Sequence, residues 1–126
     1  MVRAPDGTIY VGQLTGFPFP LGAAKIWKIV KGQAPEPVAS GFSYITDLAL
    51  GEDGSLYVTQ FATQPFLGPP SPGALIRLKP DGTREELAAG ALTSPMGVAL
   101  GNDAAYVSNH GAEAGTGEVV RIPLGT

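Results

Sequence analysis

Several residue types that common classes of site require are scarce or absent in this sequence. The 126 residues include no cysteine and one histidine, His110. A chain without cysteine forms no disulfide and offers no thiolate to a metal ion or to a substrate. These absences exclude thiol chemistry and leave the cellular compartment undetermined.

Basic clusters and long apolar runs are also missing. The eight lysines and arginines are scattered and the net charge is −3, whereas a nucleic-acid-binding surface gathers basic residues on one face. No run approaches the roughly 18 apolar residues of a membrane span, and the first residues lack the apolar core of a signal peptide. We therefore predict neither a nucleic-acid partner nor a membrane span.

Glycine and proline, in contrast, are abundant, with 18 and 12 copies. Both residues interrupt helices and favour tight turns. The apolar residues also lack the spacing of three and four that marks an amphipathic helix. The composition predicts an all-β chain of short strands.

A repeated unit accounts for most of the chain. The segment 6–11, Asp-Gly-Thr-Ile-Tyr-Val, recurs at 53–58 as Asp-Gly-Ser-Leu-Tyr-Val and in part at 103–107. The tyrosines of the three copies, Tyr10, Tyr57 and Tyr106, are 47 and 49 residues apart. A second motif, apolar residues around one cation, recurs at 26–29, 75–78 and 119–122. A period of about 40 to 50 residues built of short strands is typical of a β-propeller blade.

The pattern predicts a single partial β-propeller domain over 1–126, with about three blades at 6–40, 44–89 and 95–123. If the strands of a blade are lettered a to d, their order is b-c-d, a-b-c-d, a-b-c. The predicted strands are 8–13, 25–30 and 36–40 in the first blade, 45–50, 55–61, 74–79 and 83–88 in the second, and 97–100, 104–109 and 118–123 in the third. Alternating apolar residues bounded by glycine and proline turns set these limits.

Three blades are too few to close a propeller, which usually has four to eight. Two copies would contribute twenty predicted strands, and each copy would have an incomplete blade at both ends. Such a pair would form a ring of four-stranded blades poorly. We therefore expect the chain to be the C-terminal part of a longer propeller, whose parent protein is a candidate for export to the periplasm or the extracellular space. Alone it would expose apolar sheet faces, and we expect it to self-associate or to need the missing blades.

Four segments, 16–27, 47–58, 73–77 and 115–122, resemble the C-terminal part of the ScyD/ScyE family. That bacterial family is a group of six-bladed propellers associated with the cyanobacterial gene cluster for scytonemin, and it has no agreed reaction. More distantly, the strands are similar to NHL repeats and to the regucalcin and gluconolactonase propellers. The resemblance implies a six-bladed fold and leaves the function undefined.

The connections between strands b and c are the predicted functional face. They are long, at 14–24, 62–73 and 110–116, while the other turns are tight. Loops lengthened on one face of a propeller often mark its binding side. The alternative is that these proline- and glycine-rich loops, with Phe17, Phe19 and Phe66, only cap the blades.

Three amides, Gln13, Gln60 and Asn109, end strand b two positions after a valine. They could line a polar pocket at the propeller axis, where amide oxygens can bind calcium, or they could satisfy loop backbone groups. Asp47 opens a strand where the third blade has Gly97, so it could bind a cation, act as a base or accept backbone hydrogen bonds. His110 could serve in acid–base chemistry or be structural.

Two functional hypotheses remain. The first is a non-enzymatic binding or scaffold propeller whose b-to-c face binds an unidentified small molecule or protein, with no catalytic residue. The second is a metal-dependent hydrolase of the lactonase kind, which the distant resemblance implies, with Asp47 and Asn109 as ligands of a divalent cation such as calcium. No matching glutamate is evident, so further ligands would come from the missing blades. We favour the first hypothesis.

Overall fold

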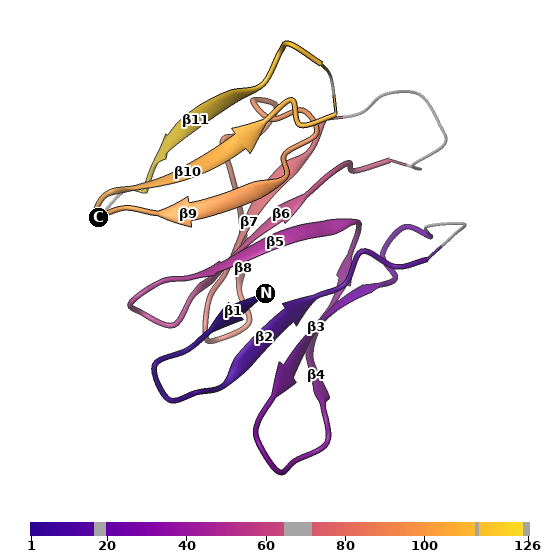
Figure 1. The fold of residues 1–126 in the computed structure, drawn as a ribbon, viewed down its shortest axis with the longest axis vertical. Helices are drawn as coiled ribbons and strands as arrows, with labels where there is room; N and C mark the ends of the chain where they lie inside the picture. Colours follow the sequence, from indigo (N-terminus) through magenta and orange to yellow (C-terminus); the bar gives the residue numbers. More distant parts are fainter. Residues whose placement is uncertain (17–19, 65–71, 113, 125–126) are drawn as a thin grey trace.

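The residues that the structure describes form eleven strands arranged in three antiparallel sheets (Figure 1). The computed structural model describes residues 1–16, 20–64, 72–112 and 114–124. These residues form no helix, and hence none that is long and apolar enough to cross a membrane. The prediction of an all-β chain is confirmed.

In each sheet every strand pairs with its neighbours in sequence. The first sheet contains β1 (Val2–Arg3), β2 (Ile9–Gly12), β3 (Ala24–Ile29) and β4 (Glu36–Phe42). The second contains β5 (Ile45–Leu50), β6 (Leu56–Gln60), β7 (Ala74–Leu78) and β8 (Arg84–Leu87). The third contains β9 (Gly97–Leu100), β10 (Ala104–Asn109) and β11 (Glu118–Pro123).

The prediction that the first unit lacks its first strand is wrong. Strand β1 pairs with β2, with Val2 opposite Tyr10 and Arg3 opposite Ile9. A hydrogen bond from Ala4 N to the carbonyl oxygen of Thr8, 2.7 Å long, continues the pairing into the turn. A two-residue strand is too short to show an alternating pattern in the sequence. The first sheet therefore has four strands, as the second does.

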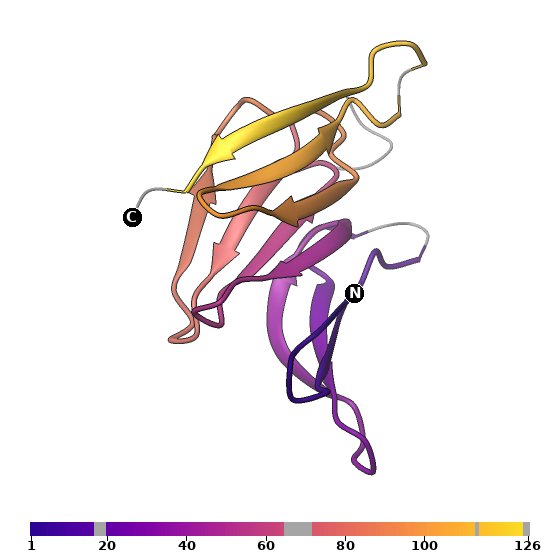
Figure 2. The same cartoon turned by 60° about the vertical axis from the view of Figure 1, so that its left-hand side comes forward.

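The three sheets stack face to face in chain order (Figures 1 and 2). The middle sheet is covered on both faces, and the alternation along β6 shows how. Leu56 and Val58 pack toward the first sheet, and Tyr57 between them packs toward the third. Side chains of a strand point alternately to its two faces, so a strand covered on both sides is buried throughout, as Leu56–Thr59 are.

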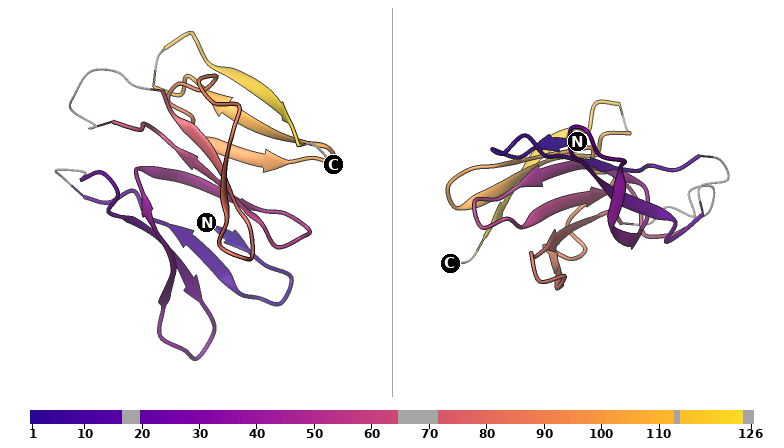
Figure 3. Two further views of the ribbon diagram at one scale, coloured as in Figure 1. Left: turned by 180° about the vertical axis from the view of Figure 1, so that it is seen from behind. Right: turned by 90° about the horizontal axis from the view of Figure 1, so that it is seen from below.

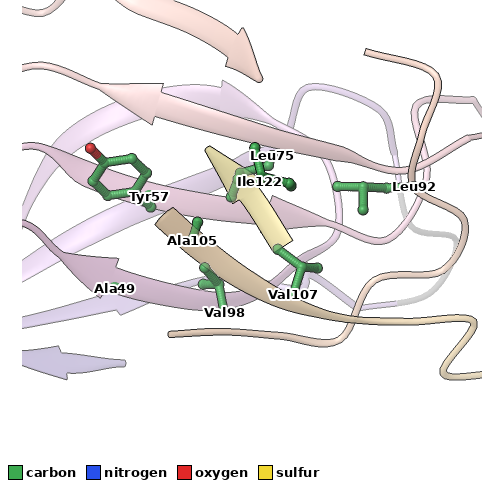
Figure 4. Close-up of a cluster of buried hydrophobic side chains, with 8 residues drawn as sticks. All are labelled: Ala49, Tyr57, Leu75, Leu92, Val98, Ala105, Val107 and Ile122. Carbon is green, nitrogen blue, oxygen red and sulfur yellow. The ribbon is translucent and has the colours of Figure 1, made fainter. Parts of the chain in front are cut away.

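Two apolar clusters hold the stack together. The cluster between the first and second sheets consists of Ala24, Ile26, Phe42, Ile45, Leu48, Leu56 and Val58. The cluster between the second and third consists of Ala49, Tyr57, Leu75, Leu92, Val98, Ala105, Val107 and Ile122 (Figure 4). Burying one such aliphatic or aromatic side chain contributes roughly 1.5–3 kcal/mol, so each junction is stabilised mainly by apolar contact.

The same positions of the repeat meet at both junctions. At the first, Ile26 of β3 and Val58 of β6 belong to one cluster. At the second, Leu75 of β7 and Val107 of β10 do so. Ile26 and Leu75 each precede the repeated cation by two residues, and Val58 and Val107 each follow the repeated tyrosine. One rule of packing therefore relates each sheet to the next.

Candidate functional site

The second strands of the three sheets end at one edge of the stack, which we call the loop edge. Ile45 N, at the start of β5, donates to the carbonyl oxygen of Gln13, just after β2, at 3.3 Å. Met96 N, just before β9, donates to the carbonyl oxygen of Ser108 near the end of β10 at 3.0 Å. Figure 3 shows the stack from behind and from below. Parts of the connections at this edge, including Phe17, Phe19 and Phe66, lie outside the described residues.

Gln60 binds the connection that leads into β5. Its Oε1 accepts a hydrogen bond from Ser43 N at 2.7 Å. The next residue, Tyr44, has a φ of 48° and its carbonyl oxygen accepts from Phe61 N at 3.0 Å. A non-glycine residue in the left-handed region needs support from its surroundings. Gln60 supplies part of that support.

Asn109 plays the same part before β9. Its Oδ1 accepts from Thr93 N at 2.7 Å, and Ser94, the next residue, has a φ of 50°. Its Nδ2 donates to Oε1 of Glu118 at 3.0 Å. Because Asn109 is only 2% exposed, these bonds satisfy groups that water reaches poorly.

Gln13 differs from the other two amides in what it binds. Its Oε1 accepts from Lys25 N at 3.1 Å, at the start of β3, and the Trp27 indole Nε1 lies 3.5 Å from the same oxygen. Gln13 therefore closes the β2–β3 connection of its own sheet. All three amides occupy the same place in the repeat, and each accepts a hydrogen bond from a backbone amide.

Asp47 links two sheets. Its Oδ1 accepts from Leu48 N at 2.9 Å, and its Oδ2 accepts from Val98 N of β9 at 3.0 Å. The amino terminus of Met1 lies 4.0 Å from Oδ1. Gly97 stands at the equivalent place in the third sheet, where a Cβ would lie 3.6 Å from the Asp47 carboxylate. The carboxylate therefore faces the backbone of the neighbouring sheet.

His110 has a carboxylate neighbour that sequence reasoning missed. Its Nε2 lies 3.4 Å from Oε1 of Glu118, the oxygen that Asn109 also contacts. The hint in the sequence was that Glu118 opens the strand that pairs with β10, where it stands opposite Asn109. A carboxylate beside an imidazole orients the ring. The arrangement can hold a proton at Nε2, and His110 Nδ1 is buried without a hydrogen-bond partner among the described residues.

The five candidate residues are thus only partly brought together. Asn109 and His110 share Glu118, whereas Asp47, Gln13 and Gln60 bind separate backbone groups. Within the described ranges no group of three or more histidine, aspartate or glutamate side chains gathers as metal ligands do. The one metal-ligating atom of Asn109, Oδ1, accepts from Thr93 N. A metal site at Asp47 and Asn109 stays a prediction.

A cleft of about 550 Å³ lies at the opposite edge, between the β5–β6 and β9–β10 turns. Its walls include Tyr57, Arg77, Asp53 and Asn102. Arg77 Nη2 lies 2.9 Å from Asp53 Oδ2, and its guanidinium lies 5.7 Å from the centre of the Tyr57 ring. The carboxylate that is hydrogen-bonded to Arg77 therefore comes from the turn between β5 and β6.

The charges in this cleft influence one another. The Ser55 backbone N–H, followed by the Arg77 guanidinium, holds the pKa of Asp53 below its usual value. Burial raises the pKa of the Tyr57 hydroxyl. Arg77 Nε is buried and lacks a hydrogen-bond partner within the described part of the chain. The repeat could have indicated this arrangement, because Tyr57 and Arg77 are opposite one another in the sheet, as are Tyr10 and Lys28.

Comparison of the sequence with protein-family models finds no match, and comparison with curated proteins finds none. The described residues define an all-β chain of three stacked antiparallel sheets.

Proposed function

We propose that the chain is a propeller-type binding module that uses the loop edge to hold its partner. In this proposal the three sheets are successive blades around an axis. The repeated packing at the two junctions supports it, because a propeller is built by applying one blade-to-blade contact several times. Membership of the ScyD/ScyE family is part of the same proposal and rests on the sequence segments that resemble that family.

The observation that carries the proposal is the exposure of three large apolar side chains at the loop edge. Leu14 and Leu21 in the β2–β3 connection are 46% and 44% exposed, and Met96 before β9 is 45% exposed. A single exposed apolar side chain needs no explanation, but several at one edge of a stack favour a contact surface. A small apolar molecule or an apolar segment of a protein fits such a surface.

The polar groups at this edge favour binding over catalysis. Gln13, Gln60, Asn109 and Asp47 each accept a backbone N–H, so their hydrogen-bonding capacity supports the connections and the junctions of the stack. A catalytic carboxylate or amide would instead be directed at the reacting atoms of a substrate. The module binds its partner at a surface and leaves the partner chemically unchanged.

The experiment is a screen of small aliphatic and aromatic fragments by ¹H–¹⁵N correlation spectra. We expect fragments that bind to shift the amide signals of Leu14, Leu21 and Met96 and their neighbours. The triple variant Leu14→Ser, Leu21→Ser, Met96→Ser should lose these shifts while keeping the dispersed spectrum of a folded sheet protein. The matched variant Val38→Ser changes a side chain that is 43% exposed on β4 and should retain them.

Shifts confined to the Tyr57–Arg77 cleft would contradict the choice of the loop edge. Hydrolysis of a lactone that requires Asp47 would contradict the non-enzymatic role. Neither result would mean that the chain is unfolded, because the dispersion of the amide signals reports folding in the same experiment.

A further inference from the structure

The two outermost sheet faces have no partner within the described residues. On the first sheet, Tyr10 and Ile26 pack toward the middle sheet, so their strand neighbours point the other way. This outward set, which we call the leading face, consists of Ile9, Val11, Trp27 and Ile29, and all four are partly exposed. It is an apolar sheet face at one end of the stack.

The third sheet has a corresponding outward face. Val98, Ala105, Val107 and Ile122 pack toward the middle sheet, so their strand neighbours in β9, β10 and β11 point away from it. This set, the trailing face, consists of Ala99, Tyr106, Val119 and Arg121. Tyr106 is 41% exposed and Val119 is 71% exposed.

The internal junctions show what each face is built to contact. Ile26 packs with Val58 at the first junction, and Leu75 packs with Val107 at the second. The trailing face offers Val119 at the repeat position of Ile26 and Leu75. The leading face offers Val11 at the repeat position of Val58 and Val107.

The tyrosines lead to the same pairing. Tyr10 packs in one cluster with Leu56 and Leu78, and Tyr57 packs in the other with Ala105 and Ile122 (Figure 4). In the repeat, Leu56 corresponds to Ile9 and Leu78 to Ile29. A third junction of the same kind would place Tyr106 on Ile9 and Ile29 of a leading face.

We propose that a second copy of this chain supplies that junction, with the leading face of each copy docked on the trailing face of the other. The internal junctions show which residues a trailing face needs as its partners. The leading face carries residues at those repeat positions, so a second copy of the chain fits the trailing face. An interface between two different patches closes into a ring when its rotation allows. Two copies provide six sheets, within the four to eight that propellers use. The closure of two copies into a ring rests on the propeller arrangement proposed above. The docking of one face on the other does not depend on it.

Strand β1 answers half of the objection to such a pair, because it completes the sheet at one end of each copy. Twenty strands with an incomplete first sheet would close a ring poorly, but the first sheet has four strands. Only the third sheet, with three strands among the described residues, is shorter than the others. At each junction of the pair, a four-stranded first sheet would therefore meet a three-stranded third sheet.

The test is the molar mass in solution, measured by sedimentation velocity over a range of concentrations. The intact chain should sediment as a discrete pair, twice its mass of 12.9 kDa. Val11→Lys and Val119→Asp each place a charge in both junctions of the closed pair, so each variant alone should be monomeric. Ala91→Asp, an equivalent change at an exposed site between β8 and β9, should leave the pair intact.

Mixing the two monomeric variants separates this arrangement from other dimers. In the mixed pair one junction keeps both native valines and the other brings the introduced lysine and the introduced aspartate together, so we expect the mass of the pair to return. This recovery also shows that both variants are folded. The proposal would be overturned if the intact chain were monomeric or if its molar mass kept rising with concentration. It would also be overturned if only one of the two variants disrupted the pair. Fragment binding at the loop edge of monomeric Val119→Asp tests the proposed function separately.

Discussion

The carboxylate of Asp47 and the backbone N–H of Val98 join two neighbouring sheets, with 3.0 Å between Oδ2 and N. Asp47 lies in β5 and Val98 in β9, which are the first strands of their sheets. The apolar clusters lie along the sheet faces, whereas this hydrogen bond connects backbone to side chain across the junction. It fixes the relative position of the two strands in a way that apolar contact, which is not directional, does not.

Replacing Asp47 with alanine should destabilise the fold. The change removes the acceptors of Leu48 N and Val98 N, and leaving such donors without partners costs about 1–3 kcal/mol when they are buried. Asp47 is 31% exposed at its side chain, so water can replace part of the loss and we expect the lower end of that range. Urea unfolding followed by circular dichroism measures the change. Glu86→Ala, an exposed carboxylate change on β8, should have little effect, and equal losses in both variants would contradict the role of Asp47.

Calcium or manganese should leave the melting temperature unchanged. A metal ion that binds the folded state at a concentration 100 times its dissociation constant would stabilise it by about 2.7 kcal/mol, which a thermal melt detects readily. Both oxygens of Asp47 already accept backbone hydrogen bonds, and the same is true of the Asn109 oxygen. A saturable rise at millimolar metal that disappears in Asp47→Ala would instead support the hydrolase hypothesis.

Asn109→Ala should cost about 1–3 kcal/mol, because it leaves the Thr93 N–H without its acceptor at a site that is 2% exposed. The loss should be accompanied by faster hydrogen exchange of the Thr93 amide. Asn102→Ala removes an exposed asparagine from the β9–β10 turn and serves as the matched control. Unchanged exchange at Thr93 in Asn109→Ala would show that the amide does not hold this connection.

Most strands could be predicted because their signals are local. The predicted ranges 45–50, 97–100, 104–109 and 118–123 agree with the observed bounds of β5, β9, β10 and β11. Apolar alternation and aspartate–glycine turns lie within a few residues of these strands, so the sequence contains the necessary information. Strand β4 continues to Phe42, beyond the predicted 40, because Phe42 pairs with Ala24 across an irregular register, and no pattern within β4 reveals that pairing.

The contacts of the candidate site could be predicted only in part. The position of the three amides in the repeat correctly indicated that they occupy equivalent places. The partners of the candidate residues lie in other parts of the chain. Asn109 binds Thr93, and Asp47 binds Val98, 51 residues away. The contact of His110 with Glu118 requires the strand register. Such pairings arise only when the sheets are assembled, so sequence spacing alone did not show them.

The close approach of the first two sheets predicts a steric effect at Gly12. A Cβ there would overlap the Ile45 side chain, with the Ile45 Cβ at 3.3 Å. Overpacking of this kind typically costs about 1–3 kcal/mol, so Gly12→Ala should lower the free energy of unfolding by a similar amount. Gly16→Ala is the control, since a Cβ at Gly16 meets no atom within 4 Å. If Gly12→Ala is as stable as the control, the junction is looser than the structure shows.

Acid should destabilise the fold through the turn aspartates. Asp6, Asp53 and Asp81 each accept the backbone N–H of the residue two positions on, at 2.9, 2.9 and 2.8 Å. These bonds, made with the charged form, hold each pKa below its ordinary value of 3.8. A carboxylate whose pKa is lower in the folded state contributes stability that is fully present above the unfolded-state pKa. That contribution is lost as the pH falls through the folded-state pKa. The free energy of unfolding should therefore be constant near neutral pH and decline below about pH 4.

Asp53→Asn isolates one of these contributions. The amide keeps an oxygen that can accept from Ser55 N but cannot titrate, so the decline of the unfolding free energy with acid should be shallower than in the intact chain. Urea unfolding at about pH 6 and about pH 3, on either side of the ordinary aspartate pKa, measures the difference between the two values. Glu86→Gln also removes one exposed carboxylate, from β8 rather than from a turn, and should leave the decline as it was. An equal effect of the two substitutions would show that net charge, not the turn hydrogen bond, governs stability in acid.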